Sequence, residues 1–186
     1  MTPAHSFVTA FIGLGSNLDH PRQQVEQGIA ALAQLPDTQL QAVSPWYGIT
    51  AVGVDSGQPD YVNGVAQLHT RLPPLTLLHA LQAIEYAQGR VRTVRWGART
   101  LDLDLLLYDH HTATDPELTL PHPRLHERAF VLRPLADIAP DLTLPNGLAI
   151  RSLLDTVDTS GTWLLNAMPT TLPSAAHSTS QDRSNP

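Results

Sequence analysis

Short apolar stretches alternate along the chain with longer segments in which apolar residues recur every three or four positions. The stretches that are short and apolar enough for strands lie at 7–14, 40–47, 61–68 and 99–108. The segments with helical spacing lie at 21–35, 73–89 and 127–135. The pattern therefore predicts the order strand, helix, strand, strand, helix, strand, followed by a third helix.

This order of elements predicts an α+β domain, because strands and helices are mixed without strict βαβ alternation. A ferredoxin-like βαββαβ core fits the order, with a mixed or antiparallel sheet that carries its helices on one face. The predicted elements belong to a single domain over residues 7–165. Residues 166–186 are rich in Ser, Thr and Pro, and we expect them to form a disordered C-terminal tail.

Composition and charge narrow the class of protein. Of the 186 residues, 42% are apolar and 15% are charged, which is a globular composition. No apolar run reaches about 18 residues, so we expect no membrane span. The first residues make a poor secretory signal, and we expect a cytoplasmic protein. The net charge of −6 argues against a nonspecific nucleic-acid binder.

All eleven basic residues are arginine, and four of them fall close together in the sequence. These four are Arg90, Arg92, Arg95 and Arg99. A guanidinium group presents a planar fork of donors that matches the oxygens of a phosphate. One interpretation of the segment is therefore an anion site, and the other is a solvated charged loop.

Two aspartates alternate with leucines on the predicted strand at 99–108. Because side chains alternate between the faces of a strand, Asp102 and Asp104 point the same way, roughly 6.5–7 Å apart at Cα. Such a pair suits Mg²⁺, which takes one or two carboxylates and leaves its other positions to phosphate and water. The alternative is an exposed face with two solvated aspartates. The neighbouring arginines favour the metal, because polyphosphate transfer needs cation and anion sites side by side.

Two polar side chains stand out elsewhere in the sequence. His122 lies between two prolines, so its backbone is rigid, and it either bonds a phosphate or caps a turn. Asn63 offers both a donor and an acceptor, which suits the edge of a flat heterocycle held between aromatic rings. The glycine-rich segment 13–17 matches neither a dinucleotide fingerprint nor a P-loop, and we interpret it as structural.

Taken together, these motifs resemble the 6-hydroxymethyl-7,8-dihydropterin pyrophosphokinase family of folate biosynthesis. The longest matching run is R-W-G-A-R-T-L-D-L-D at 95–104. The other matching segments, in the family's order, are G-S-N-L at 15–18, Q-P-D-Y-V-N at 58–63, I-E at 84–85, G-R-V-R at 89–92, L-P-H-P at 120–123 and R-A-F-V-L at 128–132. The agreement of order and spacing makes the resemblance specific.

The resemblance implies a ferredoxin-like fold and a reaction. The reaction is transfer of pyrophosphate from ATP to the hydroxymethyl group of 6-hydroxymethyl-7,8-dihydropterin, with release of AMP. Two Mg²⁺ ions, held by Asp102 and Asp104, are expected to bridge the ATP phosphates to the pterin hydroxyl. We expect ATP and the pterin as partners, neither nucleic acid nor membrane, and a monomer.

The resemblance also assigns roles by position. The residues expected to act in transfer are Arg90, Arg92, Asp102 and Asp104. The expected pterin contacts are Val52, Tyr61, Asn63, Trp96 and Phe130. The expected nucleotide contacts are Leu78, Gln82, Glu85, Arg92, Arg99, Leu105, Thr119, His122 and Arg128. The chain departs from the family pattern at Ile49-Thr50, where Thr-Pro is common, and at Glu117, where an arginine occurs.

Three other functions compete with this interpretation. A ferredoxin-like sheet with aromatic and arginine side chains can stack RNA bases, although the RNP1 motif is missing. The two aspartates could instead serve a metal-dependent phosphohydrolase. A catalytically inactive relative kept for protein contacts is the third alternative, and the intact aspartates and arginines argue against it.

Overall fold

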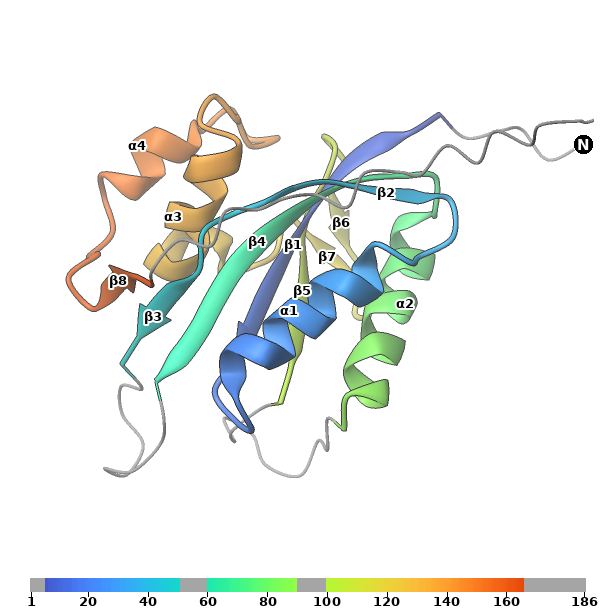
Figure 1. The fold of residues 1–186 in the computed structure, drawn as a ribbon. Helices are drawn as coiled ribbons and strands as arrows, with labels where there is room; N and C mark the ends of the chain where they lie inside the picture. Colours follow the sequence, from blue (N-terminus) through green and yellow to red (C-terminus); the bar gives the residue numbers. More distant parts are fainter. Residues whose placement is uncertain (1–5, 51–59, 90–99, 166–186) are drawn as a thin grey trace, which may run out of the picture.

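The structure, a computed structural model, describes residues 6–50, 60–89 and 100–165 (Figure 1). Its strands are β1 (Val8–Ser16), β2 (Thr38–Val43), β3 (Tyr47–Ile49), β4 (Tyr61–Thr70), β5 (Asp102–Tyr108), β6 (Ala113–Thr114), β7 (Thr119–Leu120) and β8 (Thr162–Leu164). Its helices are α1 (Pro21–Leu32), α2 (Pro74–Ala87), the 3₁₀ turn η1 (Leu125–Glu127), α3 (Ala129–Ile138) and α4 (Ile150–Leu154). The predicted α+β class is confirmed, and the short elements β6, β7, η1, α4 and β8 are additions to the predicted order.

The main sheet is antiparallel throughout. Its strand order is β5-β1-β4-β3-β8, and β2 also pairs with β4. The central strands β1 and β4 run side by side over their whole length, from Val8 opposite Thr70 to Ser16 opposite Val62. The strand β5 pairs with β1 on the other side. A separate two-stranded sheet joins β6 to β7.

The strand predicted at 40–47 is two strands, which is a correction. The segment between them contains Pro45, which has no N–H to donate to a ladder. Ser44 carries the pairing across the break, because its backbone N–H donates to the carbonyl oxygen of Val65 and its Oγ accepts from the Val65 N–H, both at 2.9 Å. As a result, β2 and β3 both lie along β4 but are offset from each other.

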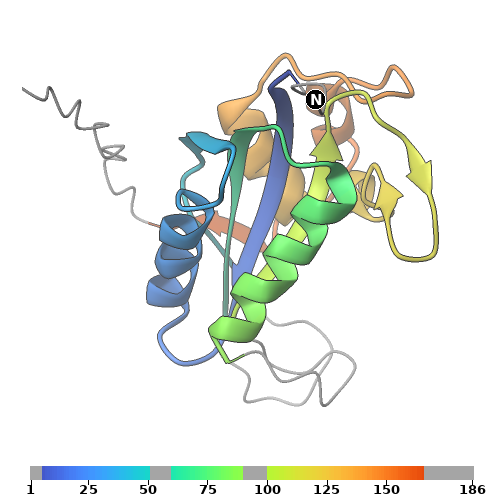
Figure 2. The same cartoon turned by 90° about the vertical axis from the view of Figure 1, so that its right-hand side faces the viewer.

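Helices cover both faces of the sheet, whereas the sequence predicted helices on one face. The helices α1 and α2 lie along one face, and α3 and α4 lie against the other (Figure 1 and Figure 2). The reason is that β1 and β4 are apolar on both sides. Ile12 and Leu68 belong to the core under α1 and α2, while Phe11 and Val65 belong to a second core that includes Leu135 of α3.

Two features of β5 decide where its polar residues lie. The pairing of β1 with β5 shifts after Phe11, so that Phe11 faces Leu107 and the next residue, Ile12, faces Leu105. Leu106 is the extra residue of this β-bulge, and both Leu106 and Leu107 join the second core. Before the bulge, Asp102 and Asp104 point to the same face as that core, as the alternation predicts.

No helix within the described ranges is long and apolar enough to cross a membrane. Residues 166–186 lie outside the described part of the chain, so the disordered tail and the domain boundary at residue 165 stay predictions.

Candidate active site

A row of residues from four strands crosses the sheet on the face that α3 covers. Gly15 of β1 pairs with Asp102 of β5 on one side and with Asn63 of β4 on the other. Asn63 pairs in turn with Tyr47 of β3. Residues directly opposite each other in antiparallel strands project from the same face, so these four positions lie side by side. The aspartate predicted to bind metal and the asparagine predicted to bind pterin therefore flank one glycine.

Asp104 lies where a histidine and an arginine converge. Its Oδ2 is 3.9 Å from Nε2 of His122 and 3.9 Å from Nη1 of Arg128. These distances are too long for direct hydrogen bonds, but they place the imidazole and the guanidinium within 4 Å of the carboxylate. The three side chains therefore present carboxylate oxygens and N–H donors to the same space, which is what a site for a metal-bound phosphate requires.

The backbone fixes the position and the tautomer of His122. The His122 N–H donates to the carbonyl oxygen of Leu106 at 2.9 Å, which attaches this segment to the bulge of β5. The Nδ1 atom of the ring accepts a hydrogen bond from the N–H of Arg124 at 3.2 Å. In the neutral ring the proton is therefore on Nε2, the nitrogen that faces Asp104.

The surroundings of His122 favour its neutral form. Burial lowers the pKa of His122 below its ordinary value of 6.5, and the positive charge of Arg128 lowers it further. Asp102 raises the pKa and Arg124 lowers it, both with smaller effects. A neutral imidazole with its proton on Nε2 is a hydrogen-bond donor, and such a donor suits a phosphate oxygen.

The predicted pterin contacts that the structure describes lie on β4 and α3. Tyr61 and Asn63 project from the same face of β4, as the sequence predicts, because they are two residues apart. Phe130 lies near the start of α3 and packs against the second core. The guanidinium carbon of Arg128 lies 5.5 Å from the centre of the Phe130 ring. Phe130 therefore lies beside the group formed by Asp104, His122 and Arg128.

Glu85, a predicted nucleotide contact, is a buried acid beneath β5. Its side chain extends from α2, and the residue is only 2% exposed. Its Oε1 accepts a hydrogen bond from the backbone N–H of Leu103 at 2.7 Å. Leu103 lies between Asp102 and Asp104, so this carboxylate supports the strand that carries both aspartates.

The other nucleotide contacts predicted in the described residues are spread over three elements. Leu78 and Gln82 lie half-buried on α2, Leu105 is buried under the helices α1 and α2, and Thr119 is exposed on β7. Their contacts with a nucleotide stay predictions. Glu117, which replaces a family arginine, lies 2.6 Å from His79 of α2, measured between Oε1 and Nε2. This side-chain contact connects α2 to the segment before β7.

Five predicted site residues lie outside the described residues. They are Val52, Arg90, Arg92, Trp96 and Arg99. Their roles in pterin binding, phosphate binding and transfer stay predictions.

The donor set around the two aspartates fits magnesium. No group of three or more histidine, aspartate, glutamate or cysteine side chains that could hold a metal occurs within 6–50, 60–89 and 100–165. Two half-buried carboxylates on one face of β5 suit a hard cation that takes its remaining ligands from phosphate and water.

Sequence reasoning missed two features of this face. Tyr47, the neighbour of Asn63 in the row, donates a hydrogen bond from its hydroxyl to Oδ2 of Asp137 at 2.6 Å, which links β3 to α3. Gly15, which we interpreted only as structural, lies between the predicted metal and pterin residues. A glycine inside a strand often marks a close approach of other groups, and that signal was present in the sequence.

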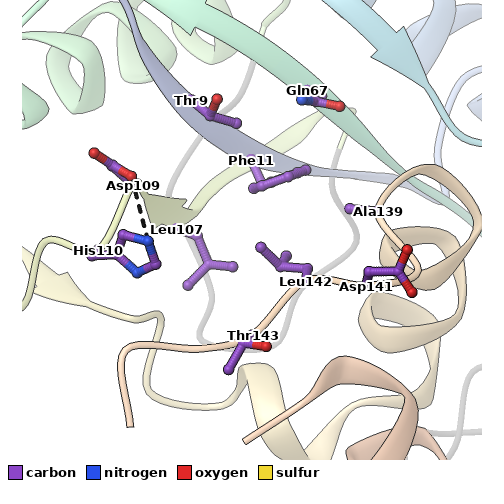
Figure 3. Close-up of a pocket in the computed structure, with 10 residues that line it drawn as sticks. All are labelled: Thr9, Phe11, Gln67, Leu107, Asp109, His110, Ala139, Asp141, Leu142 and Thr143. Atoms are coloured by element: carbon purple, nitrogen blue, oxygen red, sulfur yellow. Dashed lines mark ion pairs between the residues drawn. The ribbon is translucent and has the colours of Figure 1, made fainter. Parts of the chain in front are cut away.

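A recess of about 350 Å³ lies toward the opposite end of β1 and β5 from the row of Asp102, Gly15 and Asn63 (Figure 3). Phe11 and Leu107 are among its apolar lining residues, and Asp109, Asp141 and Gln67 add polar groups. None of the described residues predicted to bind pterin or nucleotide is among its lining residues.

The chain is similar to known proteins over most of its length. Residues 11–140 match the family model of 7,8-dihydro-6-hydroxymethylpterin-pyrophosphokinase (HPPK). A curated relative from Pseudomonas aeruginosa, named 2-amino-4-hydroxy-6-hydroxymethyldihydropteridine pyrophosphokinase, is 54% identical over 77% of this chain and 88% of its own length. A relative of the same name from Haemophilus influenzae is 49% identical over 79% of this chain and 91% of its own length.

Solved structures share the fold at low sequence identity. The crystal structure of Plasmodium falciparum HPPK-DHPS with pterin and p-hydroxybenzoate matches with a TM-score of 0.66 and 15% identity. The match covers 83% of this chain, which spans 44% of the Plasmodium chain. At this identity the likeness concerns the fold alone. The family match and the two close relatives decide the assignment: the chain belongs to the 7,8-dihydro-6-hydroxymethylpterin-pyrophosphokinase family.

Proposed function

We propose that this chain transfers pyrophosphate from ATP to the hydroxymethyl group of 6-hydroxymethyl-7,8-dihydropterin, with release of AMP, in folate biosynthesis. The names of the relatives and the family match support the reaction. The structural observation that carries it is the row on which Asp102 and Asn63 flank Gly15. Two strand spacings, roughly 10 Å, separate the two side-chain positions, so a small flat acceptor can bridge from one to the other.

The proposed step is an in-line displacement at phosphorus. The hydroxymethyl oxygen of the pterin forms a bond to the β-phosphorus of ATP, the bond from that phosphorus to the α-phosphate oxygen breaks, and AMP leaves. The hydroxyl proton passes to solvent. Phosphoryl transfer depends mainly on positioning and charge stabilisation, so no dedicated general base is assigned.

The described residues contribute by holding the reactants. Asp102 and Asp104 would hold Mg²⁺, which neutralises phosphate charge and orients the reacting oxygens when bound. The Nε2–H of His122 and the guanidinium of Arg128 converge on Asp104, where they can donate to phosphate oxygens. Asn63 would bond the edge of the pterin, with Tyr61 and Phe130 as the aromatic residues of the same site.

We also propose that the core has a ferredoxin-like topology. In this description β2 and β3 together are the second strand, and α1 and α2 are the two crossover helices. What supports the proposal is the antiparallel order β5-β1-β4-β2/β3, in which the first and third strands are central. A monomeric state and a cytoplasmic location stay predictions.

A coupled assay for AMP tests the proposed function. The reaction would contain ATP, MgCl₂ and 6-hydroxymethyl-7,8-dihydropterin, with controls that omit the pterin or add EDTA. We expect AMP release that requires both the pterin and the metal. Release of inorganic phosphate without the pterin would favour a phosphohydrolase instead. Salt-dependent RNA binding without turnover would favour an RNA-binding module.

A further inference from the structure

The backbone of Gly15 does not itself require glycine. Among the described glycines, only Gly89 and Gly147 have the positive φ that other residues avoid. Gly15 lies within the extended strand β1, where a residue with a side chain normally pairs and packs better than glycine does. The reason for a glycine at this position must therefore lie in the space around it.

The space above Gly15 is limited by the side chain of Asn63. A β-carbon built on Gly15 would lie 3.0 Å from Oδ1 of Asn63 and 4.0 Å from its Cγ, with no other contact within 4 Å among the described residues. A contact of 3.0 Å between carbon and oxygen is shorter than ordinary van der Waals contact. A side chain at position 15 would therefore displace the Asn63 amide by a few tenths of an ångström.

The Asn63 amide is a buried group that points to a ligand. The residue is 7% exposed, and its Nδ2 has no hydrogen-bond partner among the residues that the structure describes. Buried polar groups in native proteins are nearly always paired, and an orphaned donor at a candidate binding site indicates a ligand acceptor. A displaced amide would move this donor and the Oδ1 acceptor together, so both bonds to a heterocycle edge would be weakened.

We propose that Gly15 is a positioning residue for the pterin: its missing side chain leaves the room in which the Asn63 amide takes the orientation that binds the ring edge. The inference rests on the proposed function, because it takes the pterin as the ligand of Asn63. It adds a residue that sets the shape of the pterin site without contacting the phosphates. Gly15 acts through Asn63, whose amide is the group that a β-carbon at position 15 would meet.

The test compares two glycine-to-alanine variants on the same strand face. Gly15→Ala is expected to raise the KM for the pterin roughly tenfold or more and to leave the KM for ATP within about twofold, because one polar group of the pterin site is misplaced. Gly13→Ala is the matched control. The three atoms nearest to its β-carbon would all belong to the Leu106 side chain, at 3.3–3.5 Å, and methyl groups can move slightly. We expect its KM for the pterin to stay within about twofold of wild type.

Equilibrium binding of the pterin, measured by its fluorescence in the presence of a non-hydrolysable ATP analogue, gives a readout independent of turnover. The Kd should rise in Gly15→Ala by the same factor as the KM. Thermal unfolding of both variants should match wild type. A Gly15→Ala variant that binds the pterin as tightly as Gly13→Ala overturns the inference, whereas a wild-type protein without AMP formation overturns the proposed function itself.

A double variant separates positioning from a general effect on the fold. Asn63→Ala removes the Oδ1 atom that a β-carbon at position 15 would meet. In that background, Gly15→Ala should change the pterin Kd by less than about twofold, because the group it displaces is already absent. The comparison between Asn63→Ala and the double variant remains valid if Gly15→Ala alone is poorly folded. A further loss of tenfold or more in the double variant would overturn the inference.

Discussion

The carboxylate of Glu85 accepts a hydrogen bond of 2.7 Å from the backbone N–H of Leu103, the residue between the two aspartates of β5. The strand β5 ends the strand order of the main sheet, so among the described strands none lies on its outer side to accept this bond. An acid from α2 takes that place. The position of Asp102 and Asp104 therefore depends on a buried group of another element.

Replacing Glu85 is expected to weaken the fold at this strand. Glu85→Ala should lower the free energy of unfolding by roughly 2–3 kcal/mol, because the Leu103 N–H is left buried without its acceptor. Glu85→Gln should lose less, since a side-chain amide oxygen can still accept this bond. Urea denaturation of both variants checks whether Glu85→Ala is the less stable of the two. Equal stability of the alanine variant and wild type would show that the bond does not support β5.

The same two variants test the predicted nucleotide contact of Glu85. If the residue acts only by supporting β5, Glu85→Gln should keep a KM for ATP close to wild type. A direct contact with the nucleotide predicts the opposite, a raised KM for ATP in a variant that is still well folded. Steady-state kinetics with ATP varied at saturating pterin distinguish the two.

The carboxylates of β5 should be essential for transfer and not for folding. Asp102→Asn and Asp104→Asn each remove one charged oxygen donor and keep the shape of the side chain. We expect kcat to fall at least 10²–10³-fold, in the range of losing one main electrostatic group of a transfer site. AMP formation and circular dichroism measure the two properties. Near-normal turnover in either folded variant would refute the assignment.

Asp109→Asn is a suitable control for these substitutions. Asp109 follows β5 directly and its side chain is 56% exposed. Its φ of 48° is one that asparagine tolerates well. We expect turnover within about twofold of wild type, because this carboxylate lies outside the candidate site.

His122 should titrate below its ordinary pKa of 6.5 in the folded protein, because burial and Arg128 disfavour its charged form. Arg128→Leu should raise this pKa, since one nearby positive charge is removed. Two-dimensional NMR of the imidazole signals over pH 4–8 measures both values. A pKa at or above 6.5 in the wild-type protein would contradict the burial of this ring.

The lowered pKa of His122 also predicts how the stability of the fold depends on pH. A histidine whose folded pKa lies below its unfolded value stabilises the fold above the unfolded pKa, and this stabilisation is lost as the pH falls through the folded value. The stability of wild type relative to His122→Gln should therefore decrease as the pH falls below about 6.5. Urea denaturation at pH 7.5, 6.0 and 5.0 checks the trend, and a difference that grows toward acid would contradict it.

Tyr47→Phe is expected to loosen the link between β3 and α3. The tyrosine donates to Asp137 at 2.6 Å, and loss of this charged hydrogen bond should cost about 1–2 kcal/mol of stability. Burial, together with Asp137, raises the pKa of Tyr47 to about 12. The advantage of wild type over Tyr47→Phe should therefore be complete below pH 10 and shrink as the pH rises toward 12. A difference that stays constant between pH 9 and pH 11.5 would contradict this assignment.

Local patterns in the sequence predicted much of the fold. The helical spacing identified α1 and α2, and alternation along the strands placed Asp102 with Asp104 and Tyr61 with Asn63 on common faces. The break at Pro45 and the short α4 and β8 were not predicted, because a few residues carry too little periodic pattern. The packing of α3 on the second face was not predicted either, because it depends on β1 and β4 being apolar on both faces of the assembled sheet.

The family resemblance and the paired aspartates could be recognised from the sequence, because they are properties of residue types at fixed spacings. The row of Asp102, Gly15, Asn63 and Tyr47, and the support of β5 by Glu85, became visible in the folded chain. Cross-strand register and helix docking bring together residues far apart in the chain. These depend on the packing of the whole core, and no local pattern encodes them.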